Sequence, residues 1–286
     1  MFKNEIVIDR LKMCFLRDND SALWQGMSKN PDDMRIGDFD FYRCRPDGMY
    51  DGIYSVYYAQ REFGTLKFDR FSDKEHKYFW LSVENHVFYA NEKEAFQDLQ
   101  VVFGEINNIT LLDIACDMTF NPVSRIKKLI KRDDVSVVRC GVKIDDKKQE
   151  LEGVGFWHPA NCLRELAPTL YIMDADKRKC LVGYNKMKEI KKSGKHYIAE
   201  YYDNPKRLYR MEIKLKSDEL FRYFKKYDMS PTIDMLCDKK FLKAMYDEFL
   251  FRLIHVVYKR KPIGLIDAVT ALKEGYDLDV IVKNRK

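Results

Sequence analysis

The order of the predicted elements is the feature that most limits how this chain of 286 residues folds. Strand and turn signals fill most of residues 1–216, whereas helical patterns dominate from Asp218 onward. The strands do not alternate regularly with helices, as they do in parallel α/β folds. The sequence therefore predicts an α+β fold with a largely antiparallel curved sheet flanked by helices. We expect an α+β domain over residues 1–216 and a helical C-terminal region over residues 217–286.

Hydrophobic periodicity places the individual elements. Helical periodicity predicts helices at Asn91–Phe103, Asn121–Arg132, Asp218–Tyr227 and Phe241–Tyr258. Apolar and β-prone runs predict strands at Ile109–Met118, Val135–Ile144, Thr169–Asp174, Cys180–Lys186 and Tyr209–Leu215.

Several classes of protein are excluded by simple features of the sequence. No apolar stretch approaches the ~20 residues that span a bilayer, and the first residues lack the apolar core of a signal peptide. The seven cysteines contain no Cys-x-x-Cys pair, which argues against a zinc ribbon or a disulfide framework. We expect reduced core cysteines in a cytoplasmic protein with no membrane partner.

The charge is unevenly distributed along the chain. Residues 1–124 hold 14 Lys and Arg against 21 Asp and Glu, whereas residues 125–216 hold 23 against 13. A basic middle section is typical of a surface that binds a polyanion such as DNA. The alternative is a solvated face with no partner.

Two carboxylates stand four residues apart in the predicted strand that contains Leu112. Asp113 and Asp117 lie on one face of such a strand, with the small Ala115 between them. Hard oxygen ligands of this kind suit Mg²⁺ or Mn²⁺. The alternative interpretation is two acidic residues at a strand end, one of which caps a turn.

A tyrosine with a basic neighbour follows later in the chain. Tyr184 and Lys186 are expected on one strand face, and Glu189 follows where that strand is expected to end. A phenol with its usual pKa of ~10 is a poor nucleophile, but a nearby lysine or a metal-bound phosphate makes its attack feasible. The alternative is an ordinary strand tyrosine beside a basic residue.

A third cluster shows strict alternation of charged and apolar residues. Arg210, Glu212, Lys214 and Lys216 share one strand face, opposite an apolar face. This charged face is either a functional site or the solvated side of an edge strand.

The order of these three clusters resembles that of a known family. Asp-x-Ala-x-Asp from Asp113, Tyr-x-Lys-x-x-Glu from Tyr184 and Arg-x-Glu from Arg210 are similar to the Rep_trans family of rolling-circle plasmid replication initiators and related relaxases of conjugative elements. Leu170–Lys216 carries most of the likeness, with a weaker likeness back to Leu111.

The resemblance implies a metal-dependent DNA nickase in the domain over residues 1–216. Tyr184 would attack a phosphodiester at the origin, forming a 5′-phosphotyrosine and releasing a 3′-hydroxyl that primes synthesis. Lys186 and Arg210 would bind phosphate and stabilise the developing negative charge. The acidic residues near the Mg²⁺ or Mn²⁺ would be Asp113, Asp117, Glu189 and Glu212.

The chain departs from the family pattern at two places near Tyr184. Asp174–Lys179 stands where the family often has a turn with glycine or serine, and Asn185 replaces the aspartate of Tyr-Asp-Lys. The histidines form no His-x-His pair, which disfavours the other large class of tyrosine nickases.

The basic stretches around these clusters are the predicted contacts to DNA. Tyr197, Tyr201 and Tyr202 are either core residues or platforms on which bases stack. The predicted DNA-binding residues are Arg125, Lys127, Lys128, Lys131, Arg132, Lys177, Arg178, Lys179, Lys188, Lys191 and Lys192.

The expected partners follow from the implied reaction. They are double-stranded origin DNA, the nicked single strand, a helicase of the host or element, and a possible second copy of the chain. One alternative is a non-catalytic DNA-binding protein of a mobile element or phage; another is an unrelated protein in which the motif order arises by chance.

Overall fold

The computed structural model describes residues 4–16, 21–29, 32–44, 50–69, 78–90, 93–143, 154–157 and 169–283. The chain groups into two compact units whose segments interleave along the sequence. The first unit comprises Met1–Val7, Ile114–Lys214 and Lys240–Lys286, and the second comprises Ile8–Asp113 and Leu215–Lys239.

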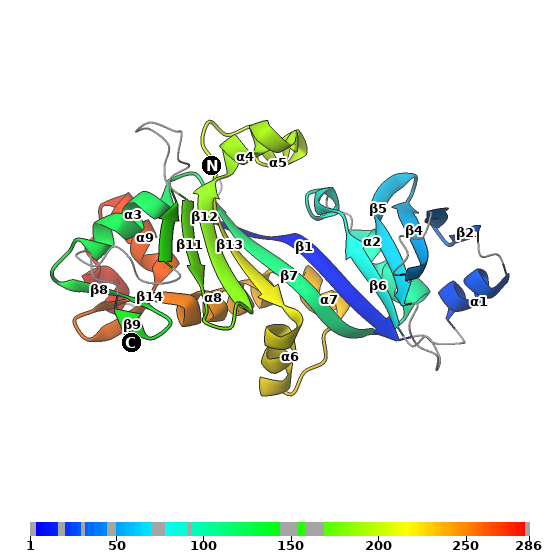
Figure 1. Cartoon of the computed structure of the whole chain (residues 1–286). Helices are drawn as coiled ribbons and strands as arrows, with labels where there is room; N and C mark the ends of the chain where they lie inside the picture. Colours follow the sequence, from blue (N-terminus) through cyan, green and yellow to red (C-terminus); the bar gives the residue numbers. More distant parts are fainter. Residues whose placement is uncertain are drawn as a thin grey trace. The chain divides into compact units, whose positions relative to one another are not determined.

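The second unit is built on a meander of antiparallel strands (Figure 1). The strand order is β1-β6-β5-β4-β3-β2, and neighbouring aromatic rings such as Phe39 and Phe63 pack in its core. Its elements are β1 (Glu5–Leu16), α1 (Ala22–Lys29), β2 (Asp33–Ile36), β3 (Phe39–Cys44), β4 (Tyr50–Tyr58), β5 (Arg61–Asp69), β6 (Tyr78–Val83), η1 (Asn85–Phe88), α2 (Lys93–Phe103), β7 (Ile106–Met118), α6 (Ser217–Lys226) and α7 (Ile233–Cys237). The start of β1 and the end of β7 belong to the first unit.

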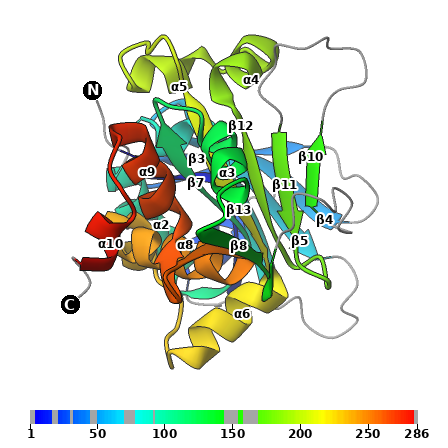
Figure 2. The same cartoon turned by 90° about the vertical axis from the view of Figure 1, so that its left-hand side faces the viewer.

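The first unit carries strands in the order β10-β11-β12-β13-β7. A smaller sheet has the order β15-β14-β8-β9, and α3 lies beside α9 (Figure 2). The elements are α3 (Pro122–Ile130), β8 (Val135–Arg139), β9 (Val142–Lys143), β10 (Val154–Trp157), β11 (Thr169–Met173), β12 (Lys179–Asn185), α4 (Lys186–Ser193), α5 (His196–Tyr201), β13 (Tyr209–Lys216), α8 (Lys239–Leu253), β14 (Ile254–Tyr258), β15 (Lys261–Gly264), α9 (Leu265–Glu274) and α10 (Asp279–Lys283).

The predicted fold class is confirmed: the fold is α+β, with a large antiparallel sheet flanked by helices. The expected domains over residues 1–216 and 217–286 stay a prediction, because compact units do not show which part of the chain folds alone. No helix among the described residues is both long and apolar enough to cross a bilayer.

Two predicted elements end earlier than expected. The helix predicted over Phe241–Tyr258 stops at Leu253, since the β-branched Val256 and Val257 lie in β14, which pairs with β8 and β15. The strand predicted over Val135–Ile144 folds back at a turn in which Cys140 and Gly141 both have positive φ, a pattern typical of tight hairpins. Residue 144 lies outside the described residues.

The described cysteines are free thiols, as expected, but they are not all in the core. Cys14, Cys116 and Cys180 are buried, whereas Cys140 is exposed. Cys162 lies outside the described residues.

Gly64 marks a close approach between two strands of the second unit. It pairs with Val83 of β6, next to an irregularity in the β4–β5 register. A Cβ atom at Gly64 would lie 2.2 Å from the carbonyl oxygen of Ser82. Because this neighbour is a backbone atom, a side chain here forces the strands apart.

We expect Gly64→Ala to lower the free energy of unfolding of the protein by about 1–3 kcal/mol, the usual cost of overpacking. The measurement is urea denaturation followed by circular dichroism. Val101→Ala, at an exposed position of α2, is the control and should change stability by less than about 0.5 kcal/mol. Equal stabilities of the two variants would contradict the prediction.

Candidate active site

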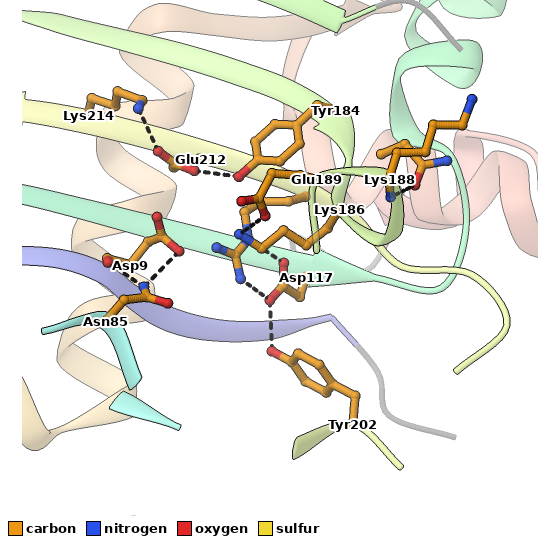
Figure 3. A network of polar contacts seen from close by, with 12 residues as sticks. Asp9, Asn85, Asp117, Tyr184, Lys186, Lys188, Glu189, Tyr202, Glu212 and Lys214 are labelled. Atoms are coloured by element: carbon orange, nitrogen blue, oxygen red, sulfur yellow. Dashed lines mark hydrogen bonds and ion pairs between the residues drawn. The ribbon is translucent and has the colours of Figure 1, made fainter. Parts of the chain in front are cut away.

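A cluster of charged and phenolic side chains lies in the first unit (Figure 3). It is built from the end of β7, from β12 and β13, from helix α4, and from the residue that follows α5. Its members, each joined to another by a hydrogen bond or an ion pair, are Asp117, Tyr184, Lys186, Glu189, Tyr202, Arg210, Glu212 and Lys214.

The candidate nucleophile is held by a buried carboxylate. The Tyr184 hydroxyl donates to Oε2 of Glu212 at 2.9 Å, and Nζ of Lys214 lies 2.9 Å from Oε1 of the same carboxylate. The side chain of Glu212 is 3% exposed, that of Lys214 is 42% exposed, and Tyr184 is half-buried. Glu212 therefore lies between a phenol and an ammonium group that solvent can reach (Figure 3).

The charged face of β13 is not a solvated edge. β13 lies between β12 and β7, and both Arg210 and Glu212 are buried. The edge-strand alternative for this segment is therefore wrong. The apolar face of β13 is buried as well, and the Tyr246 hydroxyl on α8 donates to the Met211 carbonyl at 3.0 Å. Burial raises the pKa of Tyr246 well above its usual value, so this phenol stays protonated.

Lys186 begins a helix. The sequence had suggested that it shares a strand with Tyr184, and this prediction is wrong. β12 ends at Asn185, whose side chain accepts from the backbone N–H of Lys188 and caps α4. Asparagine caps a helix as well as aspartate does, so the departure at this position preserves the local structure. Lys186 is buried, and its Nζ lies 2.7 Å from Oε2 of Glu189.

The most deeply buried part of the cluster is an ion pair. Nε and Nη2 of Arg210 donate to the two oxygens of Asp117 at 2.7 and 2.6 Å, and both side chains are 0% exposed. The Tyr202 hydroxyl donates to Oδ2 of Asp117 at 2.9 Å. A bidentate pair with a further donor satisfies the carboxylate, which is the condition under which a buried ion pair is tolerated.

Tyr202 is a cluster residue that no sequence pattern identified as one. It follows α5, and its ring is buried rather than presented to solvent as a stacking platform. Tyr201 is half-buried and donates to Glu5 at 2.7 Å. No local signal marks Tyr202, because its partner Asp117 is far away in the sequence.

The four predicted metal ligands are distributed over separate contacts. Asp117 pairs with Arg210, Glu189 with Lys186, and Glu212 with Tyr184 and Lys214. Asp113 belongs to the other unit, where it is buried with its Oδ2 3.9 Å from Arg10 Nη1.

These carboxylates do not fit a metal centre in this arrangement. Among the described residues, no group of three or more Asp, Glu, His or Cys side chains could hold a metal ion. The requirement for Mg²⁺ or Mn²⁺ therefore stays a prediction. Arg210 is fully buried, so its position does not support the predicted contact with phosphate.

The predicted DNA-binding residues fall into two groups. Some are held by their neighbours: Arg132 by Asp134, Arg178 by Asp176, Lys179 by Asp174, and Arg125 by the Phe120 ring and the Asn121 carbonyl. Lys127 is half-buried, and burial lowers the pKa of its amino group. The exposed members are Lys128, Lys131, Lys177, Lys188, Lys191 and Lys192.

The turn before β12 forms without the glycine or serine of the family pattern. Oδ1 of Asp174 accepts from the backbone N–H groups of Arg178 and Lys179 at 2.9 and 3.1 Å. Lys177 adopts a φ of 54°, the left-handed conformation that glycine usually supplies. The Asp174 side chain therefore stabilises this turn by hydrogen bonds to the backbone.

Comparison with known proteins adds one structural likeness. No family model and no curated protein matches the sequence. The fold is similar to that of a rolling circle replication initiator protein from Geobacillus stearothermophilus, with 16% sequence identity and a TM-score of 0.49. The likeness covers 95% of this chain and 97% of that one.

We expect Arg210→Met to lower the free energy of unfolding by about 3–5 kcal/mol, because Asp117 would stay buried without its cation. Adding Asp117→Leu and Tyr202→Phe removes the orphaned charge and its donor, so the triple variant should regain part of this loss. Urea denaturation measures both effects.

The control is the exposed pair of Lys243 and Asp247 on α8. Lys243→Met should cost less than about 1 kcal/mol, as exposed pairs usually do. A cost for Arg210→Met as small as that of this control would contradict a buried ion pair.

Proposed function

We propose that this protein initiates rolling-circle replication of a plasmid or mobile element by cutting one DNA strand at an origin with Tyr184. The observation that carries the proposal is the hydrogen bond from the Tyr184 hydroxyl to the buried carboxylate of Glu212. A nucleophile with an adjacent proton acceptor is one of the arrangements by which covalent catalysis activates the attacking group.

The chemistry follows from this pair of groups. The Tyr184 proton moves to Glu212, and the phenolate oxygen attacks the phosphorus. A bond forms between phosphorus and the tyrosine oxygen, and the bond between phosphorus and the 3′-oxygen breaks. The 3′-oxygen takes up a proton, and the 5′-phosphate stays on Tyr184. Glu212 thus acts as the general base.

Fixed charges around Tyr184 support the same step. Nζ of Lys186 lies 5.7 Å from the centroid of the Tyr184 ring. Nζ of Lys214 forms an ion pair with Oε1 of Glu212, the oxygen that does not accept from Tyr184. Cations placed before the reaction stabilise the negative charge that develops on phenolate and phosphate. We expect the reaction to require Mg²⁺ or Mn²⁺, and chelation with EDTA tests that expectation.

The DNA would be held through its phosphates. Lys188, Lys191 and Lys192 are exposed on α4, the helix that follows directly after the strand of Tyr184. Lysines at such positions neutralise phosphates without reading the sequence of bases. The proposed partners of this reaction are a helicase that unwinds the DNA behind the nick and a second copy of the chain.

We expect wild-type protein to convert supercoiled DNA carrying the element's own origin into nicked circles linked covalently to protein, with Mg²⁺ or Mn²⁺ in the buffer. Tyr184→Phe should abolish both nicking and the adduct, because it removes the attacking oxygen. Gel electrophoresis before and after protease treatment measures both.

Tyr171→Phe on the neighbouring strand β11 is the matched control and should nick at the wild-type rate, since its hydroxyl contacts Met173. Nicking that survives in Tyr184→Phe would place the nucleophile elsewhere. Salt-sensitive binding without nicking by wild type would favour the non-catalytic DNA-binding alternative.

We also expect substitution of Lys188, Lys191 and Lys192 by Gln to weaken DNA binding and its dependence on salt. The slope of log K against log salt should fall by about 0.9 for each phosphate contact that is lost. Fluorescence anisotropy with labelled DNA at several salt concentrations measures this slope. Gln at the exposed Lys225 and Lys261 is the control, and an equal change in that variant would argue against α4 as a DNA contact.

A further inference from the structure

We propose that Lys214 is a catalytic residue of this reaction, and that it binds the scissile phosphate once Glu212 has taken the proton of Tyr184. The inference rests on the proposed function and goes beyond it, since the sequence pattern pointed to Lys186 and Arg210 as the phosphate-binding groups.

The first observation is that one carboxylate serves two partners. Oε2 of Glu212 accepts from the Tyr184 hydroxyl, and Oε1 is paired with Nζ of Lys214, each at 2.9 Å. A phosphate attacked by the Tyr184 oxygen therefore arrives beside the Lys214 ammonium group. Figure 3 shows Glu212 between these two side chains.

The second observation is the difference in exposure among the cations of the cluster. The side chains of Arg210 and Lys186 are 0% and 3% exposed, and they are paired with Asp117 and Glu189. The side chain of Lys214 is 42% exposed. Of these three cations, Lys214 is the one that a DNA phosphate can reach while the sheet stays intact.

The third step is the movement of charge during the reaction. Before proton transfer, the Glu212 carboxylate and the Lys214 ammonium group balance each other. After transfer Glu212 is neutral, its attraction for Lys214 is weaker, and the negative charge lies on the phenolate and then on the phosphate. Lys214 lies beside the negative charge at each of these stages.

The chemistry of lysine suits this exchange. Its ammonium group carries three donors on a flexible stem, so one N–H can remain on Glu212 while another turns to a phosphate oxygen. When the bond from phosphorus to the 3′-oxygen breaks, the departing oxygen lies on the far side of phosphorus from the Tyr184 oxygen and takes a proton from solvent, while Glu212 releases its own proton to solvent. Glu212 then regains its charge and pairs with Lys214 again.

The test is single-turnover cleavage of an origin oligonucleotide at saturating DNA, with the dissociation constant measured separately. Lys214→Gln should slow cleavage by about 10²–10³-fold, the usual effect of removing one donor to a developing oxyanion, and change the dissociation constant far less. Lys214→Arg, which keeps the charge, should restore most of the rate. Lys216→Gln, at an exposed position two residues along the same strand, is the matched control and should cleave at the wild-type rate.

A second substrate separates a catalytic role from a structural one. A methylphosphonate at the scissile position lacks the negative charge that Lys214 would bind, so the penalty of Lys214→Gln should shrink by at least about tenfold, a recovery of about 1.4 kcal/mol. A purely structural defect would be equally large on both substrates.

The outcomes distinguish this inference from the proposed function. Absence of cleavage by wild type, or full cleavage by Tyr184→Phe, overturns both. Loss of cleavage in Tyr184→Phe with a rate near wild type in Lys214→Gln overturns the role of Lys214 alone. A defect confined to the dissociation constant, or one unchanged on the methylphosphonate, overturns it as well.

Discussion

The ion pair between Asp117 and Arg210 is the interaction on which the rest of the cluster depends. It joins the end of β7 to β13 in an environment without solvent, and Tyr202 attaches the residues after α5 to the same carboxylate. Because an unpaired charge at 0% exposure is so costly, the three segments have little freedom to move apart. Tyr184 and Glu212 lie on β12 and β13, so the geometry of the reactive pair is fixed by this arrangement.

Every described carboxylate of the cluster is matched by a cation or a phenol. Such a cluster has little net charge of its own and differs in this respect from the exposed lysines of α4. If the proposed function holds, attraction of DNA and chemistry on DNA are thereby carried by different groups. Long-range attraction comes from exposed cations, while the buried pairs supply fixed dipoles and proton acceptors at short range.

Much of the fold and part of the cluster were predictable from the sequence. Periodicity located β7, β12 and β13, and alternation placed Arg210 and Glu212 on one face of a strand. It did not show that this face is buried, because β7, which lies beside β13 and supplies Asp117, comes from a distant part of the chain. Lys186 was misplaced because the strand ends one residue earlier than predicted, where Asn185 caps a helix that the pattern did not predict. Tyr202 meets Asp117 only in the folded chain.

The interleaving of the two units has a consequence for synthesis of the protein. A ribosome releases β12 and β13 well before α8, yet α8 belongs to the same unit and supplies the Tyr246 hydroxyl that binds the Met211 carbonyl. The strand that carries Glu212 therefore lacks its apolar cover until α8 has been synthesised. A nascent or truncated chain that ends before α8 cannot complete this side of the sheet, and the pair of Tyr184 and Glu212 stays without its full support until α8 has been made.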